Sequence, residues 1–242
     1  MIALLKYHFK TYFKSSKFIM PLAIYLIFMV MMCGGAINDA ISIFVISIVA
    51  SYFLMVWSAF VFTDCEELIA EQIAVLKAGS NKKYYISKNI FIMLWGGIYA
   101  VLGILIPGLW KIISMIFKMG EFKNFTILNI IIAFAIHICV CILGAAVGFL
   151  WHPRIMANRK IAAIGAFSFG TMGIINGPLA EDISFVGFIK WLFPPVYFLL
   201  EKIGMGAKAF ILSDALIPML LCVAYALILV VINVIVLNKK GF

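Results

Sequence analysis

The sequence predicts an all-α polytopic membrane protein with six transmembrane helices, and three observations carry this prediction. The chain is 66% hydrophobic and only 12% charged, whereas soluble domains are roughly half apolar and about a quarter charged. Its apolar runs repeatedly approach or exceed the roughly 20 residues that an α-helix needs to cross a bilayer. No long polar insert separates these runs, so residues 1–242 are expected to form a single transmembrane domain.

The positions of the apolar runs set the expected spans. They cover about 18–37, 40–62, 90–110, 125–151, 161–180 and 210–237.

The segment 181–209 is apolar in part, but we do not count it as a span. The adjacent Pro194 and Pro195 remove two backbone donors and would break a helix inside the membrane. We therefore expect a short extracellular or re-entrant helical hairpin before the last span.

The basic residues predict how the chain is oriented in the membrane. Six spans place both termini on one side, and 13 of the 19 Lys and Arg residues lie in the segments expected on that side: the two termini, 64–88 and 152–160. The other six lie around 111–123 and 190–208. Because cytoplasmic loops are enriched in Lys and Arg, both termini are expected in the cytoplasm. The net charge of +9 is thus explained by orientation, and no nucleic-acid partner is expected.

Residues 1–17 have the period of an amphipathic helix. One stripe is basic and consists of Lys6, Lys10, Lys14 and Lys17. Another is mostly apolar and consists of Ile2, Leu5, Phe9, Tyr12, Phe13 and Ser16. This pattern is typical of a helix that lies in the membrane interface with its cations toward anionic headgroups. The alternative is a basic segment that only orients the first span.

A charged island, "FTDCEELIAEQIAVLKAGSNKKYYISKN" (62–89), separates the second and third spans. Thr63 and Glu66 match a capping box, and Gly79 matches a C-terminal stop. A helix over 64–79 is therefore predicted. Its mostly apolar stripe consists of Cys65, Ile69, Gln72, Ile73 and Leu76, with Glu67 and Glu71 on another side.

This connector is longer than two adjacent helices require, because helix–helix connections usually take about 2–8 residues. Its acidic side chains would also be repelled by anionic headgroups. We therefore favour a helix that faces a protein partner. The alternative is a solvated helix that only covers the end of the bundle.

Taken together, these features resemble the type-2 permease family of ATP-binding-cassette exporters. The resemblance rests on the basic N-terminal helix, the six spans, the acidic helix followed by "KYYISKN", and "FPPVYFLLE" before the last span. It implies that 1–17 is an elbow helix, that 64–79 is a cytoplasmic coupling helix docking on a separate ATPase subunit, and that 181–209 contains short extracellular helices. Many members carry a Gly-Thr pair after the coupling-helix glutamate, where this chain reads "EELIAEQIAVL".

The resemblance also implies the partners. The residues expected at the ATPase interface are Glu66, Glu67, Glu71, Gln72 and Leu76. Because the chain contains no G-x-x-x-x-G-K-[ST] loop, ATP and Mg are expected on the partner, and no cofactor or enzymatic activity is expected here. A second permease copy or paralogue and the lipids of a bacterial plasma membrane complete the expected partners.

Within the spans, His137 is the one ionisable side chain near the middle of the membrane. Such a group indicates either a hydrogen bond between helices or a role in a substrate or proton path. Gly173 and Gly177 form a G-x-x-x-G motif, as do Gly144 and Gly148. Small residues permit close helix packing, and the alternative is a position along a substrate path.

These features favour export of an amphipathic or hydrophobic substrate, such as an antimicrobial or toxin-like peptide. Lipid-like molecules or drugs are the alternative cargo of such an exporter. An ATP-independent channel or secondary transporter is the alternative mechanism, and it would require functional charges near the membrane midplane or repeat symmetry. The sequence contains neither a nucleophile–base pair nor a metal-ligand motif that would indicate an enzyme.

Overall fold

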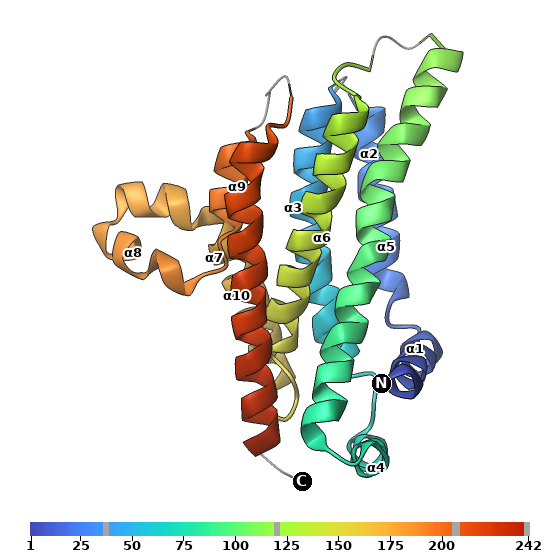
Figure 1. Cartoon of the computed structure of the whole chain (residues 1–242), viewed down its shortest axis with the longest axis vertical. Helices are drawn as coiled ribbons and strands as arrows, with labels where there is room; N and C mark the ends of the chain where they lie inside the picture. The colour runs from blue at the N-terminus through green and yellow to red at the C-terminus, as the bar shows by residue number, and fades with distance from the viewer. Residues whose placement is uncertain (36–38, 119–121, 205–208, 240–242) are drawn as a thin grey trace.

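The chain folds into a helical bundle (Figure 1). The structure is a computed structural model, and it describes residues 1–35, 39–118, 122–204 and 209–239. The described helices are α1 (Ile2–Ser15), α2 (Ile19–Gly34), α3 (Ala40–Phe62), α4 (Leu68–Ala78), α5 (Asn81–Ile116), α6 (Ile127–Phe149), α7 (Arg159–Asp182), α8 (Ser184–Ile189), the 3-10 helix η1 (Lys190–Leu192), α9 (Val196–Ile203) and α10 (Leu212–Lys239).

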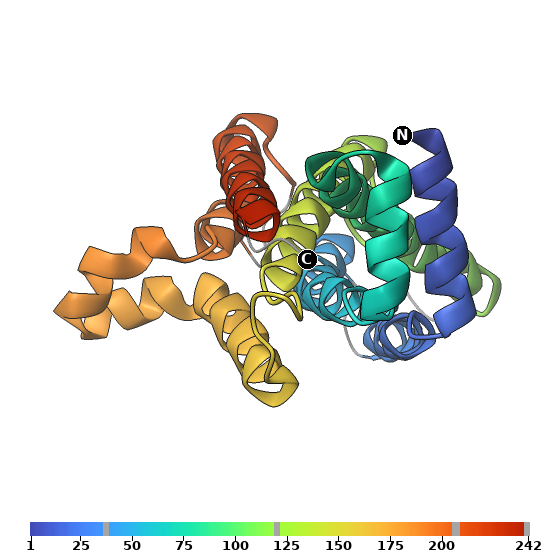
Figure 2. The same ribbon diagram turned by 90° about the horizontal axis from the view of Figure 1, so that it is seen from below.

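Helix α6 lies at the centre of the bundle and packs against α3, α5 and α10 (Figure 2). In α3 and α6, 67% of the most apolar stretch is buried inside the structure, whereas in α7 only 28% of that stretch is buried. Helix α7 is therefore peripheral. In the hairpin of α8, η1 and α9, the first two project sideways from the bundle with the end of α7, whereas α9 packs against α10 (Figure 2). Helices α1 and α4 both run across the opposite side of the bundle, at one of its ends (Figures 1 and 2).

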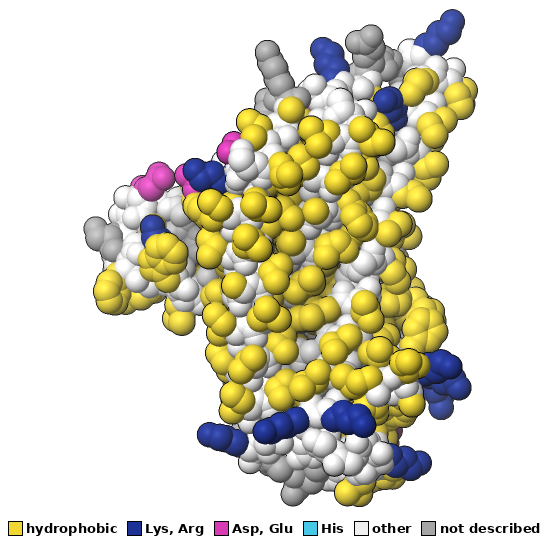
Figure 3. Space-filling view, viewed as in Figure 1, with side chains coloured by type: hydrophobic (Ala, Val, Ile, Leu, Met, Phe, Trp, Pro, Cys, Tyr) yellow, Lys and Arg dark blue, Asp and Glu magenta, His cyan; other side chains and the backbone are white. Residues whose placement is uncertain are grey.

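Five described helices are long and apolar enough to cross a membrane, and six spans result if α1 and α2 count as one broken span. The two helices meet at 76°, and α2 itself has 16 residues. The space-filling view shows an apolar surface on this face of the bundle, with Lys and Arg side chains along its lower end and others at its upper end (Figure 3). The expectation of an all-α multi-pass membrane protein is thus confirmed.

Hydropathy located most spans closely. Helix α3 has the predicted limits, and α6, α7 and α10 each begin and end within two residues of theirs. Helix α5 differs, because it begins at Asn81 where a span from about residue 90 was predicted. Its polar first turns continue the helix beyond the apolar run, and hydropathy alone does not detect such an extension. Residues 36 and 37 of the predicted first span and residues 205–208 of the predicted hairpin lie outside the described residues.

The predicted start of the island helix is wrong. Thr63 ends α3, and its hydroxyl donates to the Phe60 carbonyl at 2.6 Å. The expected capping box with Glu66 is therefore not formed, and α4 begins at Leu68 with Glu67 as its N-cap. The end is as predicted, because Gly79 adopts a left-handed conformation with φ of 73°, which favours glycine.

Both G-x-x-x-G motifs are packing surfaces. A Cβ atom on Gly148 would lie 2.2 Å from the Val56 carbonyl oxygen, so α6 needs glycine there to approach α3. On α7, a Cβ atom on Gly173 would lie 3.0 Å from Pro194, and one on Gly177 would lie 1.9 Å from the Tyr197 ring. Gly173 and Gly177 therefore let the start of α9 pack closely against α7.

Candidate functional site

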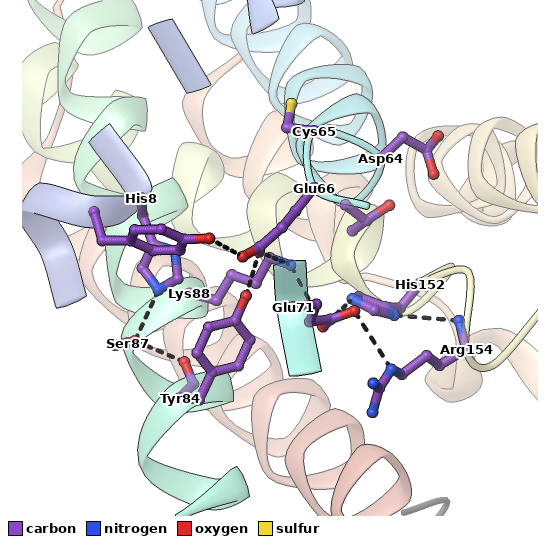
Figure 4. Close-up of polar contacts among 12 residues, drawn as sticks. His8, Asp64, Cys65, Glu66, Glu71, Tyr84, Ser87, Lys88, His152 and Arg154 are labelled. Carbon is purple, nitrogen blue, oxygen red and sulfur yellow. Dashed lines mark hydrogen bonds and ion pairs between the residues drawn. The ribbon is translucent and has the colours of Figure 1, made fainter. Parts of the chain in front are cut away.

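Four segments converge at the end of the bundle where α4 lies: α1, the 63–67 connector with α4, the first turns of α5, and the α6–α7 connector (Figures 1 and 4). Each contributes a polar or charged side chain to one buried network. We call Glu66, Glu71, Lys88, His152 and Arg154 the ion cluster.

Glu66 joins three of these segments. Its carboxylate accepts hydrogen bonds from the hydroxyls of Tyr7 on α1 and Tyr84 on α5. The ammonium of Lys88 donates to the same carboxylate at 3.3 Å. The Glu66 side chain is 3% exposed, so this carboxylate is an internal contact and does not face the solvent.

Glu71 brings α4 itself into the network. Its carboxylate lies 3.6 Å from Lys88 Nζ and 3.4 Å from Arg154 Nε. His152 Nε2 lies 3.6 Å from the same carboxylate. Lys88 is 1% exposed and lies between the two glutamates, so one buried ammonium links α4, the connector and α5 (Figure 4).

The surroundings favour a charge-balanced cluster. Burial lowers the pKa of His152 well below its usual value, and the positive charges of Lys88, Arg154 and Arg159 lower it further. For Glu66, burial raises the pKa, but the Lys88 charge and the hydrogen bonds from Tyr7 and Tyr84 outweigh it and lower the pKa. A neutral His152 leaves two carboxylates opposite two cations, which is how buried charges are tolerated.

His8 fixes α1 to α5 beside the cluster. Its Nε2 lies 2.9 Å from the Ser87 hydroxyl, and the side chain is buried. Burial, with a contribution from Lys88, lowers the pKa of His8 to about 3. The ring is therefore neutral at neutral pH.

A second set of contacts ties the connector to α7. The Arg159 guanidinium lies 2.7 Å from the Asp64 carboxylate and 4.1 Å from the centre of the Phe60 ring. Lys17 donates to the Asp64 carbonyl at 2.5 Å. The connector is thus held by α1, α5 and α7 at once, and a displacement of α4 would act on all three.

The outer face of α4 is apolar and uncovered. Ile69 is 70% exposed and Leu76 79% exposed, and Leu68 and Ile73 are exposed as well. Glu67 and Gln72 also face outward. The predicted interface residues therefore separate into Glu67, Gln72 and Leu76, which are exposed, and Glu66 and Glu71, which are internal.

Sequence reasoning missed Lys88, His152 and Arg154. Lys88 carried a signal, since it is a lysine next to the long apolar run of the third span. His152 and Arg154 lie in a turn that follows a different span, so only the fold brings them to α4.

The lysines of the predicted basic stripe lie on the surface of α1 and just after its end. Lys6, Lys10, Lys14 and Lys17 are exposed, and so are the apolar side chains of Ile2, Phe9 and Phe13. Tyr12 instead packs inside, against Phe62 and Trp95. One side of α1 is therefore fixed to the bundle, and its remaining surface carries both lysines and apolar groups.

His137 is remote from this site and fully buried. Its Nδ1 lies 2.7 Å from the Ala133 carbonyl oxygen, and its Nε2 lies 2.8 Å from the Ser47 hydroxyl on α3. Both ring nitrogens are thus engaged within the bundle, which favours the hydrogen bond between helices.

No protein-family model matches this chain, and no curated protein or solved structure matches it.

Proposed function

We propose that this chain is the transmembrane permease subunit of an ATP-binding-cassette exporter, driven by a separate ATPase subunit that docks on α4. The single observation that carries the proposal is the two-sided construction of α4. Its inner face is tied to the bundle by a buried carboxylate, and its outer face exposes apolar side chains.

The outer face has the chemistry of a docking surface. Leu68, Ile69, Ile73 and Leu76 project from a helix at the end of the bundle, beyond its membrane-spanning part. An amphipathic helix that exposes its apolar face commonly fits a groove on a partner protein, and clustered exposed apolar groups mark interaction sites. Glu67 and Gln72 supply polar contacts at the edge of this surface.

The inner face has the construction needed to transmit a displacement. Glu71 connects α4 to α5 through Lys88 and to the α6–α7 connector through Arg154. Asp64 connects the start of the same segment to α7 through Arg159. An ATPase that pulls α4 would therefore move α5 and α7 together and change access to the substrate path.

The substrate we propose is amphipathic or hydrophobic, such as an antimicrobial or toxin-like peptide, with lipid-like molecules or drugs as the other class. Support comes from the apolar surfaces of the spans. The engagement of both nitrogens of His137 within the bundle argues against an ATP-independent proton-coupled transporter that uses this residue. A second copy or paralogue of the chain completes the proposed assembly in the plasma membrane of a bacterium.

The test is purification of the tagged chain from its native membranes in a mild detergent, followed by a measurement of Mg-ATP hydrolysis. The wild-type preparation should contain an ATPase polypeptide and hydrolyse ATP. The double substitution Ile73→Asp and Leu76→Asp should remove both, because it places charges in the apolar contact.

The matched control is Lys82→Asp, which changes an exposed side chain at the start of α5 and should leave the activity in place. A wild-type chain that retains transport but never co-purifies with an ATPase would overturn the proposal. So would a double variant that keeps full ATPase association.

A further inference from the structure

A cavity of about 610 Å³ lies between the α8–α9 hairpin, the end of α7 and the middle of α10. It is separate from the ion cluster, because the hairpin and α4 lie far apart (Figure 1). The volume falls in the range of cavities that hold small ligands.

Aromatic rings dominate its walls: Trp191, Phe193, Tyr197, Phe198 and Tyr225. Two contacts hold these walls in place. The Tyr225 hydroxyl donates to the Leu192 carbonyl at 2.6 Å and so joins α10 to the hairpin. The Tyr197 ring lies directly against Gly177 of α7.

Two carboxylates also line the cavity, Glu181 from α7 and Glu201 from α9. Both are exposed, and neither forms an ion pair with any residue that the structure describes. Among the described residues of the lining Lys190 is the one lysine, and its ammonium lies 5.6 Å from the centre of the Trp191 ring. The lining is therefore formally negative, and acidic side chains are visible on the upper edge of this projection (Figure 3).

We propose that this cavity binds a cationic amphiphile, a molecule that combines an apolar chain with an ammonium group. Aromatic rings attract ammonium groups through their negative faces, and the carboxylates of Glu181 and Glu201 add charge complementarity. Leu221 and Ile228 of α10 offer an apolar wall to the chain of the ligand.

The entrance suits a ligand that arrives from the lipid. Trp191 is 78% exposed at the cavity edge, and neighbouring Phe185, Phe188 and Leu192 of the hairpin are also exposed. The site is independent of the proposed ATPase partner, and its test needs no ATPase.

The experiment is isothermal titration calorimetry of the purified chain in a neutral sugar detergent, with decyltrimethylammonium as the probe. Decanol and decyl sulfate serve as neutral and anionic probes of the same chain length. The wild type should bind the cation more tightly than either of the other two. The double substitution Glu181→Gln and Glu201→Gln should weaken cation binding about tenfold, as expected for the loss of two partly exposed charge contacts.

Three further variants make the test specific. Lys190→Gln should tighten cation binding, whereas it would weaken binding of a phosphate-bearing ligand. Trp191→Leu should weaken binding of the cation but leave that of decanol nearly unchanged. Asp182→Asn is the matched control, since Asp182 is exposed beside Glu181 but does not line the cavity.

Two results would overturn the proposal. One is equal cation affinity in the wild type and the double glutamine variant. The other is binding of decanol or decyl sulfate at least as tight as that of the cation. Neither result would bear on whether α4 docks an ATPase.

Discussion

The ammonium of Lys88 lies 3.3 Å from the Glu66 carboxylate, and both side chains are almost completely buried. Lys88 belongs to a helix of the bundle, whereas Glu66 belongs to the connector that carries α4. Because the same ammonium lies 3.6 Å from Glu71 on α4, this one side chain joins the outermost helix to the bundle.

Replacing Lys88 by methionine should strongly destabilise the protein. The substitution removes the cation between two buried carboxylates, and an uncompensated buried charge costs about 3–5 kcal/mol. The measurement is the thermal unfolding midpoint of the purified chain in a neutral detergent. Lys82→Met is the control, because Lys82 is exposed on the same helix. A Lys88→Met protein that unfolds at the wild-type temperature would contradict a buried ion cluster.

Acidification should destabilise the end of the bundle before the carboxylates titrate. His8 faces Ser87, Lys88 and Glu66, and His152 faces Glu71, Lys88 and Arg154. The pKa of His8 lies near 3 and that of His152 well below its usual value. The unfolded chain therefore takes up protons below about pH 6.5 that the folded chain does not.

Above about pH 6.5 each histidine is neutral in both the folded and the unfolded chain, so the free energy of unfolding does not depend on its titration. Below that pH, the free energy of unfolding decreases by about 1.4 kcal/mol per pH unit for each histidine that the fold keeps neutral. The measurement is the thermal midpoint of the wild type and of His152→Gln at pH 7.5 and at pH 5. The variant should lose less stability on acidification. Equal losses in the two proteins would show that His152 is not held neutral.

Gly148→Ala should destabilise the contact between α3 and α6. The added Cβ atom would lie 2.2 Å from the Val56 carbonyl oxygen, so the two helices would have to separate, and overpacking of this kind typically costs about 1–3 kcal/mol. Gly97→Ala is the matched control, because no atom of the described residues lies within 4 Å of the Cβ atom it adds. If both variants show the same thermal midpoint, the close approach of α3 and α6 is incorrect.

The sequence predicted the spans because hydropathy reports directly on residues that lie in lipid. It failed at the start of the charged island, where tertiary contacts compete with local signals. It also missed the polar first turns of α5, which extend that helix beyond its apolar run. Thr63 and Glu66 have the spacing of a capping box, and a helix cap contributes only about 1 kcal/mol. The Thr63 hydroxyl instead binds the Phe60 carbonyl, and Glu66 is bound by Tyr7, Tyr84 and Lys88.

No sequence pattern predicts the ion cluster. Glu71 and Arg154 lie in segments separated by two membrane-spanning helices, and no period relates them. The exposed face of α4 was closer to prediction, because Ile69, Ile73 and Leu76 share a helical stripe whichever residue begins the helix. The sequence could predict an apolar stripe, but only the packed bundle shows that this stripe faces outward and that Glu71 faces inward.

The proposed contact between the outer face of α4 and an ATPase can be tested by photo-crosslinking from position 76. A benzoylphenylalanine side chain at position 76 would be irradiated in intact native membranes, and the adducts would be sequenced by mass spectrometry. Position 82, which is exposed on the neighbouring helix α5, provides the comparison. We predict an adduct between position 76 and a polypeptide that contains an ATP-binding P-loop, and a much weaker one from position 82. Adducts from position 76 only with lipid or with this chain itself would show that α4 does not dock on an ATPase.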